Sequence, residues 1–234
     1  MNEKIEALVL SQRDYRENDD LLRVITRDHG LLTFIAHSAR KLSSRNRYLP
    51  MCLYEFLYDA KDGKTMFTVH SGKLLESFYE DKDILRLSYL NTLFETLEKL
   101  GDLVNGDHYD ALIFTLRNDN EEDRYLLGSL FYSFLCRDQG ISPMVDGCAV
   151  CGKKQVVALS NRAGGFLCSE HAAGMEAEDV EALRKFRLVN KASFEYFKQL
   201  KGYKYDKKDF CRTADFFYEN SGIHCRSYDF LMKL

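Results

Sequence analysis

Four side chains that favour soft metal ions stand in two closely spaced pairs, Cys148 with Cys151 and Cys168 with His171. Two residues separate the members of each pair, so one tight turn can aim both side chains at the same ion. Gly152 directly follows the second cysteine and allows the backbone to turn sharply there. The pattern predicts one zinc ion, Zn2+, held by four protein ligands in a zinc ribbon.

The alternatives to a zinc site are a pair of disulfides or four unrelated side chains. The chain has seven cysteines, an odd number, and it begins without the charged and then apolar segment of a secretory signal. We therefore expect a reducing cytosol, where disulfides are rare. The other cysteines are expected to be dispensable for metal and mostly buried; they are Cys52, Cys136, Cys211 and Cys225.

A catalytic metal is disfavoured because four protein ligands leave no coordination position for water. The sequence also lacks the His-x-Glu and Pro-Cys-x-x-Cys signature of zinc deaminases. Between the ligand pairs, residues 156–159 have the pattern of a short strand, residues 160–165 are turn-forming and residues 166–167 return the chain. A structural metal in a small hairpin is therefore expected.

A second group of chemically informative residues is basic. No acidic residue occurs between Asp28 and Glu55, although four basic residues fall within eight positions of that stretch. Such a segment favours docking of a polyanion. The four predicted DNA contacts are Arg40, Lys41, Arg45 and Arg47, with Arg13 and Arg16 as weaker candidates.

Side chains next to these basic residues are also suited to binding a polyanion. Ser38, Ser43, Ser44 and Asn46 can donate hydrogen bonds to phosphate oxygens. The ring of Tyr48 is predicted to stack on a base. The alternative is a solvated loop whose charges only keep the edge of a sheet soluble.

Charge is unevenly distributed along a chain whose net charge is only −3. Residues 1–80 sum to 0, residues 81–182 to −9 and residues 183–234 to +6. With 45% hydrophobic and 13% aromatic residues, the 234-residue chain can form cores of one to three small domains. Since no apolar run reaches membrane-spanning length, a soluble protein is expected.

The elements that must position these residues change type near residue 80. Strand-like stretches are separated by breaks rich in Gly and Asp, which predicts a small five-stranded barrel of the OB type. An SH3-like barrel or an open sheet fits the same pattern. The predicted strands are residues 7–13, 21–26, 31–37, 53–60 and 65–78.

From Asp83 the apolar residues recur with helical period. A third helix is predicted to begin with Asn120 as its N-cap, and this explains the acidic residues 121–123 better than a metal or catalytic site does. The predicted helices cover residues 84–100, 109–116, 121–139, 178–200 and 207–220. The predicted fold class is α+β, with an OB domain (1–80), a helical domain (81–145 and 176–234) and an inserted zinc ribbon (146–175).

Eight short blocks carry a resemblance, namely residues 7–10, 14–19, 26–31, 38–41, 140–143, 148–152, 164–168 and 226–231. In this order along the chain they resemble the RecO family of bacterial recombination mediators. The family usually has glycine where Ser38 stands, and more often cysteine where His171 stands. Histidine is also a zinc ligand, so His171 in place of cysteine keeps the site able to bind zinc.

The resemblance implies binding of single- and double-stranded DNA, annealing of complementary strands, and action with RecR in helping RecA replace single-strand-binding protein. It also implies a cytoplasmic protein, associated with the nucleoid when bound to DNA, that is not an enzyme and has no membrane partner. The acidic C-terminal tail of single-strand-binding protein is expected to dock on the basic C-terminal region. The candidate residues there are Arg184, Lys185, Arg187 and Lys191.

Two other functions fit part of the pattern. An RNA-binding protein with an OB fold and a zinc ribbon predicts the same charge distribution but a preference for the 2′-hydroxyl. A hydrolase or deaminase that uses the metal is opposed by the closed set of ligands.

Overall fold

The computed structural model describes residues 2–44, 46–60, 66–80 and 83–234. The chain divides into two compact units, one of Met1–Ile113 with Cys225–Leu234 and the other of Phe114–His224. The division falls inside a helix, α2 (Gly106–Asn118), and each unit is described by itself. Among the described residues, no helix combines the length and the apolar character needed to span a bilayer.

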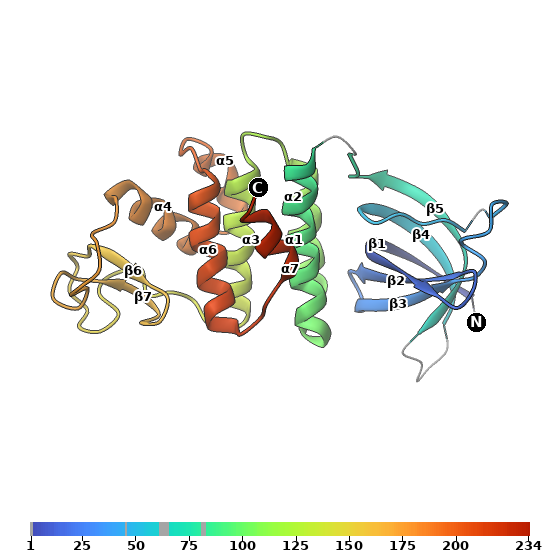
Figure 1. Ribbon diagram of the computed structural model, residues 1–234, viewed down its shortest axis with the longest axis horizontal. Helices are drawn as coiled ribbons and strands as arrows, with labels where there is room; N and C mark the ends of the chain where they lie inside the picture. The colour runs from blue at the N-terminus through green and yellow to red at the C-terminus, as the bar shows by residue number, and fades with distance from the viewer. Residues whose placement is uncertain (1, 45, 61–65, 81–82) are drawn as a thin grey trace. The chain divides into compact units, whose positions relative to one another are not determined.

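The first unit begins with a five-stranded barrel of the predicted OB type (Figure 1). The strands pair in the order β1-β2-β3-β5-β4, and β4 pairs back with β1. Among the described strand pairs of the barrel, β3–β5 is parallel, over three residue pairs, and the other four are antiparallel. The strands are β1 (Asn2–Tyr15), β2 (Asp19–Thr26), β3 (Gly30–Ala36), β4 (Cys52–Asp59) and β5 (Phe67–Ser77).

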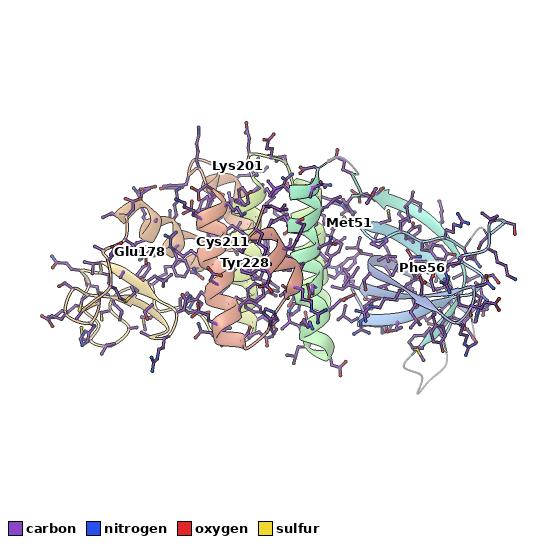
Figure 2. All side chains as sticks on the ribbon, viewed as in Figure 1. Met51, Phe56, Glu178, Lys201, Cys211 and Tyr228 are labelled. Carbon is purple, nitrogen blue, oxygen red and sulfur yellow. The ribbon has the colours of Figure 1, made fainter. Side chains whose placement is uncertain are left out.

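Alternation along the strands fills the barrel with apolar side chains. Leu22, Val24, Phe34 and Phe56 are fully buried, and the rings of Phe34 and Phe56 meet edge to face at 5.4 Å (Figure 2 labels Phe56). Arg23 lies between the buried Leu22 and Val24 on β2, so its side chain is on the outside of the barrel. This outer face carries the polar groups of the unit's candidate sites.

Helices α1 (Ile84–Leu100) and α7 (Arg226–Leu231) pack together in the same unit. Asp83 caps α1 through the backbone N–H of Arg86. The Glu95 carboxylate accepts hydrogen bonds from the backbone N–H groups of Arg226 and Ser227, so it caps α7 from a distant part of the sequence. Helix α7 was not predicted from the sequence.

The second unit contains α3 (Arg124–Asp138), α4 (Val180–Lys191), α6 (Lys207–Ser221) and a small two-stranded sheet, β6 (Ala158–Ser160) with β7 (Gly165–Leu167). The hairpin predicted between the ligand pairs is therefore present. Short helices η2 (Phe194–Tyr196) and α5 (Phe197–Leu200) follow α4.

Two predicted helix boundaries in this unit are wrong. The single helix expected over residues 178–200 ends at Lys191, because Ala192 and Ser193 are extended. This break lets Phe194 and Phe197 both pack against Phe114, with ring centroids 5.2 and 5.7 Å away.

The predicted N-cap of α3 is also displaced. The N-cap residue of α3 is Asp123 rather than Asn120. The Asn120 carboxamide oxygen instead accepts from the backbone N–H groups of Glu122 and Asp123, so it closes the turn that precedes the helix.

Candidate metal centre and nucleic-acid surface

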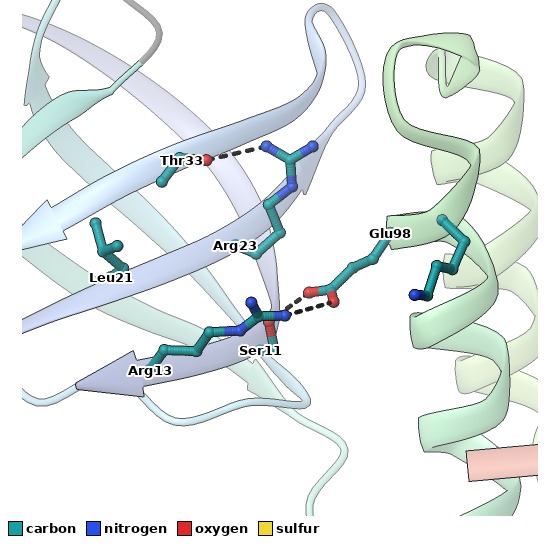
Figure 3. Close-up of a pocket in the computed structure, with 7 residues that line it drawn as sticks. Ser11, Arg13, Leu21, Arg23, Thr33 and Glu98 are labelled. Carbon is teal, nitrogen blue, oxygen red and sulfur yellow. Dashed lines mark hydrogen bonds and ion pairs between the residues drawn. The ribbon is translucent and has the colours of Figure 1, made fainter. Parts of the chain in front are cut away.

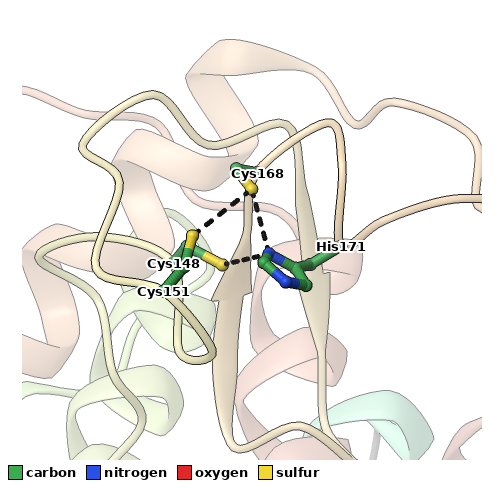
Figure 4. Close-up of side chains that lie close together, drawn as sticks. All are labelled: Cys148, Cys151, Cys168 and His171. Atoms are coloured by element: carbon green, nitrogen blue, oxygen red, sulfur yellow. Dashed lines mark hydrogen bonds between the residues drawn. The ribbon is translucent and has the colours of Figure 1, made fainter.

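The four predicted metal ligands converge at one point beside the β6–β7 hairpin (Figure 4). Their ligand atoms all lie within 4.8 Å of one another. The Sγ atoms of Cys151 and Cys168 are 3.7 Å apart, and His171 Nδ1 lies 3.5 Å from Cys148 Sγ and 3.3 Å from Cys168 Sγ. Sulfur ligands about 2.3 Å from a tetrahedral zinc ion are separated by about 3.8 Å, so the cluster has the dimensions of a zinc site.

Two turns aim the ligands at this point. In the first, the backbone N–H of Gly152 donates to the Cys148 carbonyl at 2.8 Å, with Gly152 at φ +74°, a left-handed conformation that favours glycine. In the second, the N–H groups of His171 and Ala172 donate to the Cys168 carbonyl at 3.1 and 2.9 Å. Each turn therefore presents two side chains, as the spacing predicted.

The local electrostatics favour the thiolate at Cys148 and Cys168. At Cys151 the backbone N–H of Lys153 lowers the pKa, but burial and the neighbouring thiols raise it overall. Burial raises the pKa of the Cys148 thiol, but hydrogen bonds from backbone N–H groups, including those of Cys151 and Val150, lower it overall to about 6. The backbone N–H of His171 likewise holds the pKa of Cys168 below its usual value. Since zinc binds the thiolate form, both sulfur atoms are prepared for metal at neutral pH.

The predicted basic strip lies in the segment that joins β3 to β4. Lys41 and Arg47 are exposed, whereas Arg45 lies outside the described residues. Arg47 donates to the backbone carbonyls of Ala39 and Lys41, which holds the segment in a compact turn. Lys41 and Arg47 therefore combine exposure with a defined backbone.

The Arg40 side chain is bound to residues of the barrel. Its guanidinium contacts Asp14 at 2.5 Å and the backbone carbonyls of Arg16 and Glu17 at 2.6 and 2.8 Å. Its Nε atom faces the buried Asp20 carboxylate at 3.7 Å. Arg40 is therefore less available for the predicted DNA contact than Lys41 or Arg47.

Tyr48 does not have the exposure that its predicted base-stacking role requires. Only 2% of the residue is exposed, and its ring packs edge to face against Tyr54 and Phe56 at 5.3 and 4.9 Å. Gly72 makes this possible, because a Cβ atom there would lie 2.5 Å from the Tyr48 ring. The prediction for Tyr48 is wrong: the ring belongs to the core. Of the weaker candidates, Arg13 and Arg16 are both exposed.

Two family models match the chain, and they meet near residue 80, where strands give way to helices. The family model described as Recombination protein O N terminal matches residues 1–78, and the one described as Recombination protein O C terminal matches residues 81–222. The chain belongs to the RecO family. The predicted resemblance is confirmed, and the chain has the family identity of a DNA repair and recombination protein.

Curated RecO relatives match almost the whole chain. The DNA repair protein RecO of Listeria welshimeri is 26% identical over 99% of this chain and 94% of its own length. The RecO protein of Moorella thermoacetica is 29% identical over 83% of this chain and 77% of its own length. That of Oceanobacillus iheyensis is 24% identical, with coverage of 94% and 96%.

The RecO-family chain carries its predicted partner-binding cations on α4. All four pair with carboxylates of the same unit. Arg184 lies 3.8 Å from Glu181 and Lys185 lies 2.9 Å from Asp209, while Arg187 and Lys191 contact Asp146 at 2.7 and 2.5 Å. These last two pairs tie α4 to the segment that leads into the first metal-ligand turn.

Arg184 has the longest carboxylate contact of the four α4 cations. Its side chain is 59% exposed and lies over the Tyr203 ring, 5.3 Å from the centroid. Arg184 is therefore the most accessible of the four predicted partner contacts.

Arg23 is a surface group of the RecO-family chain that was not predicted from the sequence. Its neighbours Leu22 and Val24 are buried in the barrel, so strand alternation places Arg23 on the outer face. There it lies across the β1–β2 pairing from Ser11 and donates to Thr33 Oγ1 at 2.9 Å. The signal that could have identified this face is the charged Arg23 between two apolar residues, Leu22 and Val24.

Proposed function

We propose that the chain is a recombination mediator that binds single- and double-stranded DNA, anneals complementary strands and, with RecR, helps RecA load on DNA coated by single-strand-binding protein. The observation that carries the proposal is the match of both RecO family models to a chain that begins with an OB barrel. OB barrels bind oligonucleotides through one face and the adjoining loops. Annealing requires only that two polyanions be held together while their bases stay available, so the proposed function needs no catalytic residue.

The β3–β4 segment is proposed as one DNA-contacting surface. Lys41 and Arg47 are its exposed cations, and Arg45 is retained as a proposal from the sequence. Leu42 is 98% exposed and replaces Tyr48 as the candidate for apolar contact with bases. Such contacts are independent of sequence, as annealing of arbitrary strands requires.

The Cys148, Cys151, Cys168 and His171 cluster is proposed to hold one structural Zn2+. The distances and the lowered pKa values of Cys148 and Cys168 support this choice. When bound, the ion supplies a cross-link between the two ligand turns, and its binding free energy becomes part of the folding free energy of the ribbon. The chain's own residues contribute the thiolates and the imidazole.

The acidic and apolar tail of single-strand-binding protein is proposed to dock beside α4. Arg184 leads the candidates because it combines exposure with an aromatic neighbour, Tyr203. Lys185, Arg187 and Lys191 would have to exchange their carboxylate partners to bind an acidic tail. The proposed location is the cytoplasm, with association to the nucleoid through DNA.

The proposed function is tested by titrating a labelled single-stranded DNA oligonucleotide at several salt concentrations, with unlabelled RNA of the same sequence as competitor. We expect tight binding that weakens as salt rises, and weaker competition by RNA than by DNA. Absence of DNA binding at low salt would reject the proposal. Stronger competition by RNA would favour an RNA-binding function instead.

A further inference from the structure

A pocket of about 370 Å³ opens on the outer face of the barrel, beside the last turn of α1 (Figure 3). Ser11 and Arg13 of β1, Arg23 of β2 and Thr33 of β3 form its strand side. Register explains the grouping, because Ser11 pairs with Arg23 and Arg23 pairs with Thr33 across adjacent strands. The remaining lining residues are Leu21, Glu98 and Lys99.

The lining is predominantly cationic. Arg13, Arg23 and Lys99 surround the single carboxylate of Glu98. The Arg13 side chain is 76% exposed, and the Arg23 guanidinium is oriented by its 2.9 Å bond to Thr33. Guanidinium groups match the geometry of phosphate oxygens, so the net positive lining favours a phosphate group.

Glu98 occupies the position where such an anion would be attracted. Its carboxylate accepts a short hydrogen bond from the Ser11 hydroxyl, and its other oxygen lies 3.7 Å from Arg13 Nη2 (Figure 3). That distance is too long for a hydrogen bond, so the Arg13 guanidinium keeps its donors available. The Glu98 side chain is only 17% exposed, which strengthens its repulsion of a second anion.

We propose that this pocket receives a backbone phosphate of single-stranded nucleic acid, with Arg13, Arg23 and Lys99 as donors and Glu98 as an internal competitor that limits affinity. The inference rests on the proposed DNA-binding function and adds a second contact surface to the β3–β4 segment. Its place on the β1–β2–β3 face fits the face that OB barrels use for oligonucleotides. Moderate affinity suits a mediator that must release strands after pairing them.

The key variant is Glu98→Gln, which removes the charge but keeps an oxygen able to accept from Ser11. Its affinity for a labelled oligothymidylate at 0.1 M salt should rise about three- to tenfold, as expected from removing one carboxylate near a bound phosphate. Glu55→Gln is the matched control, because Glu55 is a barrel carboxylate on β4 that pairs with Lys4 outside the pocket. Any gain in DNA affinity in the Glu55→Gln variant measures the nonspecific effect of removing one negative charge.

Two further measurements make the test specific. The gain in DNA affinity from Glu98→Gln should disappear in a variant that also carries Arg13→Gln and Arg23→Gln. In the Arg13→Gln, Arg23→Gln double variant, the salt slope of single-strand binding should be smaller than in the parent by up to about 1.4 in log units if both arginines contact phosphate. Melting curves of every variant confirm that the barrel is folded.

The outcomes separate this inference from the proposed function. If the parent binds DNA and Glu98→Gln gains no more than Glu55→Gln, the pocket assignment is overturned while DNA binding stands. If the parent binds no DNA, both fail. Competition by submillimolar inorganic phosphate at constant ionic strength would also overturn the assignment, because it would identify a site for small anions.

Discussion

Replacing Arg40 by alanine should destabilise the barrel, although sequence analysis treats this residue as a surface charge for DNA. The guanidinium joins the β1–β2 turn to the β3–β4 segment through Asp14 and the carbonyls of Arg16 and Glu17. It is also the cation beside Asp20, a residue only 2% exposed. Gln12 provides Asp20 with one hydrogen bond, at 2.6 Å, on its other oxygen.

The size of the effect follows from these contacts. The pair with Asp14 contributes less than about 1 kcal/mol, because the Asp14 side chain is 81% exposed. The two carbonyl contacts contribute about 1 kcal/mol each, and loss of the cation beside buried Asp20 costs about 1 kcal/mol or more. The sum is about 3 kcal/mol, which corresponds to a fall in melting temperature of roughly 10 °C for a unit of this size.

The assay is thermal and urea unfolding of the whole chain, with Lys41→Ala as the matched control on the adjacent exposed residue. Lys41→Ala should change the free energy of unfolding by less than about 0.5 kcal/mol. Arg40→Lys should fall between the two, because an ammonium group cannot reach all four partners. An Arg40→Ala variant as stable as Lys41→Ala would refute the reasoning and return Arg40 to the set of free DNA contacts.

Three other predictions follow from particular residues. Ser38 has φ +57°, so Ser38→Gly should raise the free energy of unfolding by about 1 kcal/mol in urea titrations; an unchanged or lower value would show that its conformation costs nothing. Burial raises the pKa of Glu95, but hydrogen bonds from Ser227 and the Arg226 N–H lower it overall, so its stabilising effect is complete above its unfolded pKa and is lost as pH falls through the lower folded pKa. Glu95→Gln should therefore cost about 1 kcal/mol at pH 7 and less toward pH 3, and a pH-independent cost would contradict the capping role. Cys168→Ser should lose bound zinc and lower the melting temperature, whereas Cys136→Ser should keep one zinc per chain by elemental analysis; equal zinc content in the two variants would contradict the ligand assignment.

The sequence predicted features whose causes are local. The ligand pairs need only two short turns, so their spacing was sufficient to predict the cluster at Cys148 and Cys168. Strand alternation and Gly or Asp breaks predicted the five strands, because each break has its own turn chemistry. The four remaining cysteines are buried, as expected of free thiols.

The sequence could not predict features that depend on distant partners. From the sequence, Tyr48 is predicted to lie in a loop. Its place in the core depends on packing against Gly72 and Phe56, which lie on strands β5 and β4. Helix α7 has six residues, too few for a clear periodic pattern, and its cap comes from Glu95. The pocket at Arg13 and Glu98 joins residues 85 positions apart, so no local pattern could indicate it.

The most direct test of the proposed function is the annealing rate of two complementary oligonucleotides coated with single-strand-binding protein, measured by fluorescence energy transfer with and without this chain. The account predicts that the chain accelerates annealing, and that the acceleration falls as salt rises because phosphate contacts are lost. A folded, zinc-loaded chain that leaves the annealing rate unchanged at low salt would contradict the assignment as a DNA-binding recombination mediator.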